Sequence, residues 1–395
     1  MKKNNLTVLR GGLLDSAATS RKTFVSAYIT NTRLMGVVGM YMHFHLPDNQ
    51  TLGELHQFFY FDSEEFGFEN YQSVLGRNPM RLSEIENSLI GGLGGEKIQV
   101  TLREACYLLQ EYVRFNKKHQ IPLPEGLTEY GFLLEQEVFL SEPEHYILIN
   151  KQCTSVENSY EAINYFLMRV IGKDFEAAGY LAYKDLNMDL FPEHPAGTFC
   201  KNTIEHEDDA DTYLCESLVE FSGNYYISVT EVALTGLMVS RFERISLFRV
   251  SPAEAAMTLA RSEFISVYEM LIDPSTFSPA STEKSAAAMV TFHDNGVLYM
   301  IFHPNNKHVA KREYRLNEDV LGMYFITTSG QLLAAAYSLE EIKLLEKDLS
   351  ESSIGHSLIP IGRYEFQEAV LYEFIQSGFG SFEDFVNAIR TDDED

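Results

Sequence analysis

Short strands that turn back on themselves set the pattern of this sequence. Residues 286–303 alternate apolar and polar side chains on both sides of Asp294-Asn295-Gly296, and Asn-Gly pairs favour tight hairpin turns. Gly223-Asn224 marks a further turn within the strand-rich residues 211–250. Groups of strands are followed by groups of helices instead of alternating with them one by one. The sequence therefore predicts an α+β fold with mainly antiparallel sheets and helices packed on one face.

The length of the chain predicts more than one domain. Single hydrophobic cores stop growing at roughly 250–300 residues, and this chain has 395. Two prolines and several Ser and Thr residues interrupt the pattern near 272–286, which is typical of a linker. The predicted parts are a flexible basic segment (1–24), an α+β region (25–272) with two subdomains that would divide near 119–151, a linker (273–285), a C-terminal antiparallel-sheet domain with terminal helices (286–390) and an acidic tail (391–395).

Hydrophobic periodicity and cap signals place the elements within these parts. Ser83 with Glu86 and Thr101 with Glu104 have the spacing of capping boxes, so each pair is expected to begin a helix. Pro252 is expected at the first position of a long helix. Besides the two hairpin regions, the expected strands are 33–46, 55–62, 145–149, 309–316, 320–328 and 331–336. The expected helices are 82–92, 101–119, 159–172, 251–271, 339–349, 364–376 and 382–389.

The charge of the chain disfavours some classes of partner. With 31 Lys and Arg against 57 Asp and Glu, the formal net charge is -26, which repels nucleic-acid backbones and anionic membranes. An acidic surface of this size suits solubility or a protein partner, including a second copy of the chain. We therefore expect a protein partner or a homo-oligomer, and neither nucleic acid nor a membrane.

Cysteine spacing and hydropathy predict a cytoplasmic location. The four cysteines are too far apart for a CxxC pair and too few for a disulfide framework, so they are expected to be reduced core residues: Cys106, Cys153, Cys200 and Cys215. Arg10 and a pair of glycines interrupt the apolar run near the start before it reaches the length of a secretory signal. No stretch of eighteen apolar residues is present that would span a membrane.

Residues 40–62 (MYMHFHLPDNQTLGELHQFFYFD) bring three histidines into two strands joined by a short polar loop. If the hairpin closes symmetrically about that loop, His45 lies opposite His56, and His43 shares their face of the sheet. The apolar side chains of both strands then point to the other face, toward the core. The sequence predicts that three imidazoles converge at one end of the strand pair.

Such a set of imidazoles could bind zinc or iron with an open coordination position. The predicted metal ligands are His43, His45 and His56, with Asp48 or Glu54 as a fourth ligand or a base. The alternative is a half-exposed sheet face that uses His and Tyr because both side chains are amphipathic. Both interpretations stay open at this point.

Residues 305–315 (NNKHVAKREYR) are the basic concentration of this acidic chain. Their cationic side chains could hold an anionic ligand such as a nucleotide, or could contact an acidic surface. The predicted anion-binding residues are Lys307, Lys311, Arg312 and Arg315. A solvated strand and turn is the alternative.

The sequence carries no motif that settles the function. It has neither a G-x-S-x-G nucleophile elbow nor a G-x-G-x-x-G dinucleotide loop, and "SLIGGLGGEK" lacks the spacing of a phosphate loop. Whether the protein is an enzyme is left open. The first hypothesis is a cytoplasmic, non-catalytic binding or regulatory protein that needs no cofactor and whose acidic surface engages protein partners. The alternatives are a metal-dependent enzyme that uses the histidine hairpin with zinc or iron, and an anion- or nucleotide-binding module.

Overall fold

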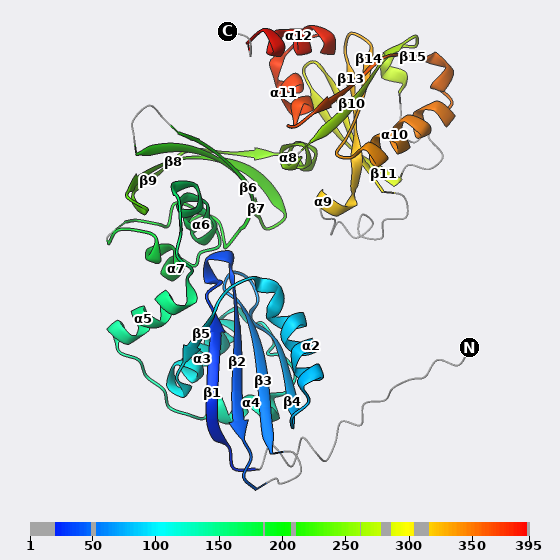
Figure 1. Cartoon of the computed structure of the whole chain (residues 1–395). Helices are drawn as coiled ribbons and strands as arrows, with labels where there is room; N and C mark the ends of the chain where they lie inside the picture. Colours follow the sequence, from blue (N-terminus) through cyan, green and yellow to red (C-terminus); the bar gives the residue numbers. More distant parts are fainter. Residues whose placement is uncertain are drawn as a thin grey trace, which may run out of the picture. The chain divides into compact units, whose positions relative to one another are not determined.

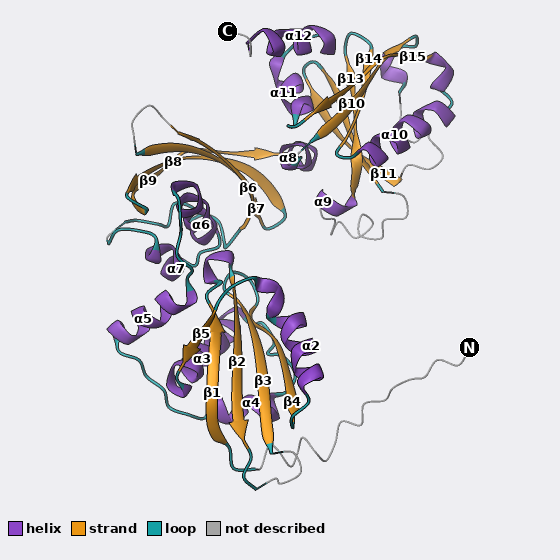
Figure 2. Ribbon diagram, in the orientation of Figure 1, coloured by secondary structure: helices purple, strands orange, loops and turns teal. Residues whose placement is uncertain are grey.

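The structure of the chain is a computed structural model that describes residues 20–48, 53–184, 186–206, 211–260, 262–277, 286–303 and 316–392. The chain forms two compact units, one with residues up to Ser222 and Ser228–Ser246, the other with Gly223–Ile227 and the residues from Leu247 onward. Figure 1 colours the elements along the sequence, and Figure 2 colours them by type. Three antiparallel sheets with helices confirm the predicted α+β class, while the predicted domain limits stay predictions.

The first unit contains a five-stranded sheet with the spatial order β4-β3-β2-β1-β5. The first four strands form an antiparallel meander, and β5 pairs with the free edge of β1. Because side chains of a strand alternate between faces, Met40 and Met42 are fully buried on one face while Tyr41 and His43 are partly exposed on the other. The strands are β1 (Thr23–Thr30), β2 (Val37–His45), β3 (Glu54–Asp62), β4 (Gly67–Leu75) and β5 (Lys97–Val100).

Two helices, α3 (Leu102–His119) and α4 (Leu127–Leu134), cover the apolar face of this sheet. Helix α3 begins after Thr101, and the expected capping box with Glu104 is confirmed. The packed residues form one core in which aromatic rings of β3 and β4 meet the helices; its members include Met40, Met42, Phe59, Phe61, Phe68, Leu109 and Tyr130. This core fixes the sheet, and the sheet positions the residues of its other face.

Helix α2 (Pro79–Leu89) packs on that other face. The start expected after Ser83 was wrong, because the helix has Asn78 as its N-cap and begins at Pro79, more than one turn earlier. The Asn78 side chain accepts a hydrogen bond from the Arg81 backbone N–H, and a proline at the first helical position loses no hydrogen bond. The apolar contacts of α2 with the sheet involve Phe58, Val74, Ile85, Leu89 and Ile90.

Three further helices follow in the first unit: α5 (Glu142–Gln152), α6 (Ser159–Ile171) and α7 (Phe175–Tyr180). The strand expected at 145–149 was wrong, because a capping box between Ser141 and Glu144 starts α5 and carries these residues into it. The next sheet has the order β6-β7-β8-β9, and α6 packs against it. Its strands are β6 (Thr198–His206), β7 (Thr212–Phe221), β8 (Asn224–Thr235) and β9 (Met238–Val250).

The second unit contains a six-stranded sheet with the order β11-β12-β13-β14-β10-β15. The hairpin predicted at 286–303 is confirmed, with Asp294 and Asn295 between the paired residues His293 and Gly296. The strands are β10 (Glu263–Met270), β11 (Ala286–His293), β12 (Gly296–Phe302), β13 (Val320–Thr327), β14 (Gln331–Ala336) and β15 (Leu358–Phe366). The helices are α8 (Pro252–Leu259), α9 (Leu316–Asp319), α10 (Leu339–Glu351), α11 (Val370–Ser377) and α12 (Phe382–Asp392).

Two expected helices of this region were wrong in their extent. The helix expected at 251–271 ends at Leu259, and β10 follows as a strand between β14 and β15. Alternating β-branched and aromatic residues in β10 suit a buried central strand, so sheet pairing decided an ambiguous pattern. The helix expected at 364–376 starts only at Val370, because the preceding residues extend β15 to Phe366.

Several predictions fall outside the residues that the structure describes. These are the strand at 309–316 apart from Leu316, which begins α9, the first nineteen residues of the basic segment, most of the linker and the last three residues of the tail. The four basic residues Lys307, Lys311, Arg312 and Arg315 also lie outside the described part of the chain. Among the described helices, none combines the length and the apolar character needed to cross a bilayer.

Candidate metal centre

Strands β2 and β3 bring two of the three predicted histidines face to face. His43 pairs with His56 in the antiparallel register, and His45 pairs with Glu54. The expected pairing of His45 with His56 was therefore wrong by two residues. Because side chains alternate with a period of two, this offset leaves every side chain on its expected face. Glu54, at the start of β3, takes the place opposite His45.

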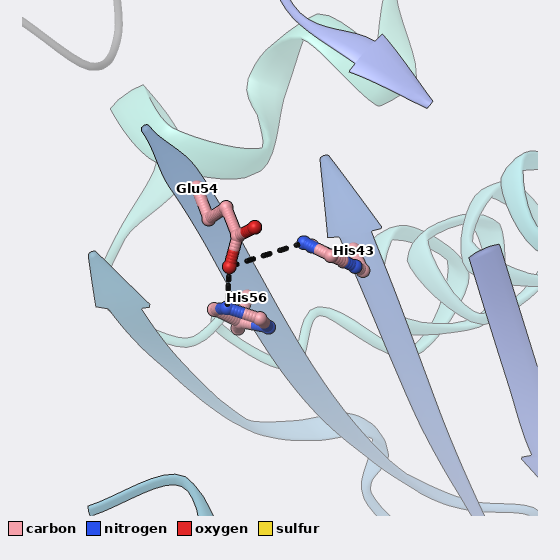
Figure 3. A group of neighbouring side chains, drawn as sticks. All are labelled: His43, Glu54 and His56. Carbon is pink, nitrogen blue, oxygen red and sulfur yellow. Dashed lines mark ion pairs between the residues drawn. The ribbon is translucent and has the colours of Figure 1, made fainter. Parts of the chain in front are cut away.

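His43, Glu54 and His56 form a compact cluster on the face of the sheet opposite the main core (Figure 3). The two imidazole rings are stacked, with centroids 4.4 Å apart. Glu54 Oε2 lies 3.7 Å from Nε2 of His43 and 3.5 Å from Nε2 of His56. One ligand atom from each of the three residues lies within 4.8 Å of the other two. Three potential metal ligands thus converge without any rearrangement of the backbone.

The cluster is shielded from solvent, yet the Nε2 atoms of its two histidines lack hydrogen-bond partners among the described residues. The exposed fractions of the side chains are 17% for His43, 12% for Glu54 and 6% for His56. Nε2 of each histidine is buried, and neither forms a hydrogen bond with a residue that the structure describes. A buried polar atom without a partner costs free energy, so such atoms require an explanation. A bound cation would satisfy both nitrogens at once.

Neighbouring groups hold the cluster in place from two sides. The Tyr41 hydroxyl lies 2.7 Å from Nδ1 of His56, the ring nitrogen that faces away from Glu54. Arg77 donates to Glu54 Oε1 through Nε at 2.8 Å, and its Nη2 lies 2.6 Å from the same oxygen. The carboxylate therefore has one oxygen on the arginine and the other directed at the two imidazoles.

Electrostatics favours neutral imidazoles beside an ionised carboxylate. Burial lowers the pKa of His43, although Glu54 opposes that shift. Burial and the neighbouring His43 lower the pKa of His56. The hydrogen bond from Arg77 lowers the pKa of Glu54. Burial raises the pKa of Tyr41 to about 12, which keeps its hydroxyl protonated. Metal ions bind these same forms, namely neutral histidine and carboxylate.

The two separations that involve Glu54 are close to those of a small coordination sphere. Typical Zn–N and Zn–O bonds of about 2.0–2.2 Å place neighbouring ligand atoms of a tetrahedral site about 3.3 Å apart. The observed separations of 3.5 and 3.7 Å between Glu54 Oε2 and the two nitrogens need to shrink only slightly. Two imidazoles and one carboxylate are the protein ligands of several catalytic metal sites, in which water fills the remaining position.

The other predicted site residues lie outside this cluster. The His45 side chain is exposed on the same face, next to Glu54, and is not one of the three converging ligands. Asp48 accepts a hydrogen bond from the Arg21 backbone N–H at 3.3 Å. The four basic residues of 305–315 are not among the described residues. The metal-ligand prediction as a set of three histidines stays a prediction, and the geometry favours Glu54 as the third preformed ligand.

The alternation of the strand places Tyr41 on the same face as His43, as the sequence predicted, but the contact of its hydroxyl with His56 was missed. No local signal could have indicated Arg77, which reaches Glu54 only because β4 pairs with β3 and ends beside it.

Comparison with known proteins identifies no relative of this chain. No family model, no curated protein and no solved structure matches the chain. The evidence for a function is therefore the geometry of the cluster of His43, Glu54 and His56.

Proposed function

We propose that the protein binds one divalent transition-metal ion through Nε2 of His43, Nε2 of His56 and Oε2 of Glu54. The observation that carries this proposal is the pair of buried Nε2 atoms that form no hydrogen bond with a described residue and lie 3.7 Å and 3.5 Å from one carboxylate oxygen. Three protein ligands leave a position of a tetrahedral ion for water, as in catalytic zinc sites. A metal-dependent activity is thus the function that this geometry supports best.

The ligand set narrows the choice of ion. Imidazole nitrogens suit Zn²⁺, Fe²⁺, Ni²⁺ and Cu²⁺, whereas Mg²⁺ and Ca²⁺ prefer sites made only of oxygen ligands. Two neutral imidazoles and one carboxylate leave a net charge of +1 on a divalent ion, and Arg77 neutralises part of the carboxylate charge on its far oxygen. We therefore propose zinc or iron as the bound ion, the same two metals that the sequence pattern predicts.

The test is the metal content and metal affinity of the purified full-length chain. We expect about one equivalent of zinc or iron per chain, and restoration of one equivalent after chelation and reloading. The variants His43→Ala and His56→Ala should both lose the metal. His119→Ala is the matched control, because His119 is exposed on α3 and lies outside the cluster.

Thermal unfolding gives an independent measurement. Zn²⁺ at 100 times its dissociation constant should raise the free energy of unfolding of the parent protein by about 2.7 kcal/mol. The two cluster variants should show no such gain. A parent protein that neither retains nor takes up any of these ions would refute the proposal, as would metal binding that survives both substitutions.

The remaining functional predictions are not tested by this geometry. A cytoplasmic location and an acidic surface that engages a protein partner or a second copy stay predictions. The anion-binding prediction at Lys307, Lys311, Arg312 and Arg315 also stays a prediction, since it concerns residues outside the described part of the chain.

A further inference from the structure

Tyr41 makes a contact with the cluster that the metal proposal does not use. Its hydroxyl lies 2.7 Å from Nδ1 of His56, on the side of the ring away from Glu54. The Tyr41 ring is held between Tyr28, with stacked rings 4.9 Å apart, and Phe58, at 5.1 Å. Nδ1 of His43 has no such hydrogen bond from a described residue. The hydroxyl therefore acts on one of the two imidazoles and is itself held by aromatic packing.

We propose that Tyr41 is a positioning residue that directs Nε2 of His56 at the metal ion and supports the tautomer that binds it. This inference rests on the proposed metal site and names a residue that controls its affinity. Histidines that bind metals almost always place their other ring nitrogen against a hydrogen-bonding group, which fixes both the ring orientation and the tautomer.

The proton balance explains why a hydroxyl suits this position. A neutral imidazole carries a single N–H, which must be on Nδ1 when Nε2 binds the metal. Nδ1–H then donates to the Tyr41 oxygen. Without metal, the hydroxyl can instead donate to Nδ1, and the ring proton lies on Nε2, toward Glu54. Since a hydroxyl both donates and accepts, Tyr41 keeps its hydrogen bond to His56 in both states.

The variant Tyr41→Phe removes this hydrogen bond and keeps the aromatic ring that packs against its neighbours. Tyr28→Phe is the matched control, because Tyr28 belongs to the same aromatic stack and its hydroxyl donates to Glu86 at 2.6 Å instead of to a histidine. Each variant removes one hydroxyl from a partly buried tyrosine on the same face of the same sheet. A difference between them reports the contact with His56.

The first measurement is the Zn²⁺ dissociation constant, obtained by competition with a chelating dye. Tyr41→Phe should raise it roughly 10- to 100-fold, the range found when a metal-bound histidine loses its outer partner. Tyr28→Phe should leave it close to the parent value. Equal weakening in both variants would assign the effect to packing, and an unchanged constant in Tyr41→Phe would remove any role of the hydroxyl; either result overturns the inference.

The second measurement is nitrogen NMR of protein with isotope-labelled histidine, with and without Zn²⁺. The Nδ1 and Nε2 signals of His56 should shift in Tyr41→Phe already without metal, and Zn²⁺ should leave the ring proton on Nδ1 in the parent protein. Unchanged His56 signals in metal-free Tyr41→Phe would overturn the inference by themselves. A parent protein that binds neither Zn²⁺ nor Fe²⁺, Ni²⁺ or Cu²⁺ refutes the proposed function, whereas a parent that binds Zn²⁺ only as tightly as Tyr41→Phe refutes the role of Tyr41 alone.

Discussion

Two buried polar regions of the first unit differ in how completely their groups are paired. At one end of the sheet, Arg33 donates to both oxygens of Asp174 at 2.9 Å, to Glu176 at 2.9 Å and to Gln152 at 3.3 Å. In the His43, Glu54 and His56 cluster, both Nε2 atoms lack a hydrogen bond from any described residue. The first region is complete with protein groups alone, whereas in the second Glu54 Oε2 lies 3.7 Å and 3.5 Å from the two Nε2 atoms, farther than in a normal hydrogen bond.

The difference indicates what each region contributes. A buried ion pair with matched donors and acceptors holds elements together, and removal of one partner leaves an uncompensated charge. A buried polar atom without a partner lowers stability and is retained where it serves another purpose. Arg169 is an intermediate case, because its Nη2 donates to Glu64 at 2.6 Å while its Nε and Nη1 have no described partner.

The largest expected effect breaks the paired region. Arg33→Met leaves Asp174, whose side chain is 3% exposed, as a buried charge without its main partner. We expect a loss of about 3–5 kcal/mol in the free energy of unfolding, measured by urea denaturation. Arg114→Ala is the control, because it breaks an exposed pair with Glu111 and should cost less than about 1 kcal/mol. Similar losses in the two variants would contradict the structural role of Arg33.

The second prediction extends the comparison to a half-paired group in the second unit. Glu263 is fully buried on β10; its Oε2 accepts the Leu371 backbone N–H at 2.7 Å, and its Oε1 has no described partner. Burial raises the pKa of Glu263 from about 4.5 to about 7. Because the folded protein holds this proton more tightly than the unfolded chain, the stability contributed by Glu263 is complete below pH 4.5. It falls as the pH rises, and the loss is complete once the pH exceeds 7.

Glu263→Gln removes this dependence because the amide stays neutral. Relative to the parent protein, the variant should gain about 3 kcal/mol of unfolding free energy between pH 4.5 and pH 8. Urea denaturation at several pH values measures the difference. Glu269→Gln, at an exposed position of the same strand, is the matched control for the loss of a carboxylate. A constant difference between Glu263→Gln and the parent across this range would contradict the prediction.

The contrast between the two regions also explains how far the sequence could predict them. The faces of β2 and β3 were predictable, because a strand with one apolar face has only one way to bury it. The register was not, since it depends on how the loop closes, and Leu46 N–H donates to Gly53 O at 2.8 Å. The register error of two residues kept all these side chains on the predicted face of the sheet. It placed His56 opposite His45, where the structure has Glu54.

The paired region had no sequence signal at all. Arg33 and Asp174 are 141 positions apart, and neither belongs to a periodic pattern that would bring them together. Likewise, β10 could not be distinguished from a helix by its own residues, because its place between β14 and β15 depends on partners far along the chain. Local periodicity predicted the class of the fold and the face of the sheet that carries the site. Pairing between distant residues decided the Arg33–Asp174 contact and the strand structure of β10.

The third prediction concerns the unpaired region and separates ligand binding from stability. Glu54→Gln keeps the shape of the side chain but removes the charge that faces the two imidazoles. We expect Zn²⁺ binding to weaken by at least the roughly 10- to 100-fold that loss of an outer partner costs. In the presence of a chelator, the urea midpoint should change little, unlike that of Arg33→Met. Strong destabilisation without metal would show that the cluster is a structural ion pair.

The smallest expected effect concerns His45, the predicted ligand that lies outside the cluster. Its exposed ring could reach the ion only by giving up rotamer freedom, which costs about 0.5–1.5 kcal/mol and offsets much of a weak additional bond. His45→Ala should therefore raise the Zn²⁺ dissociation constant less than about tenfold, and less than His43→Ala does in the same competition assay. If both alanine variants lose binding equally, His45 is recruited as a fourth protein ligand. The site would then be closed to water, and its role would be structural instead of catalytic.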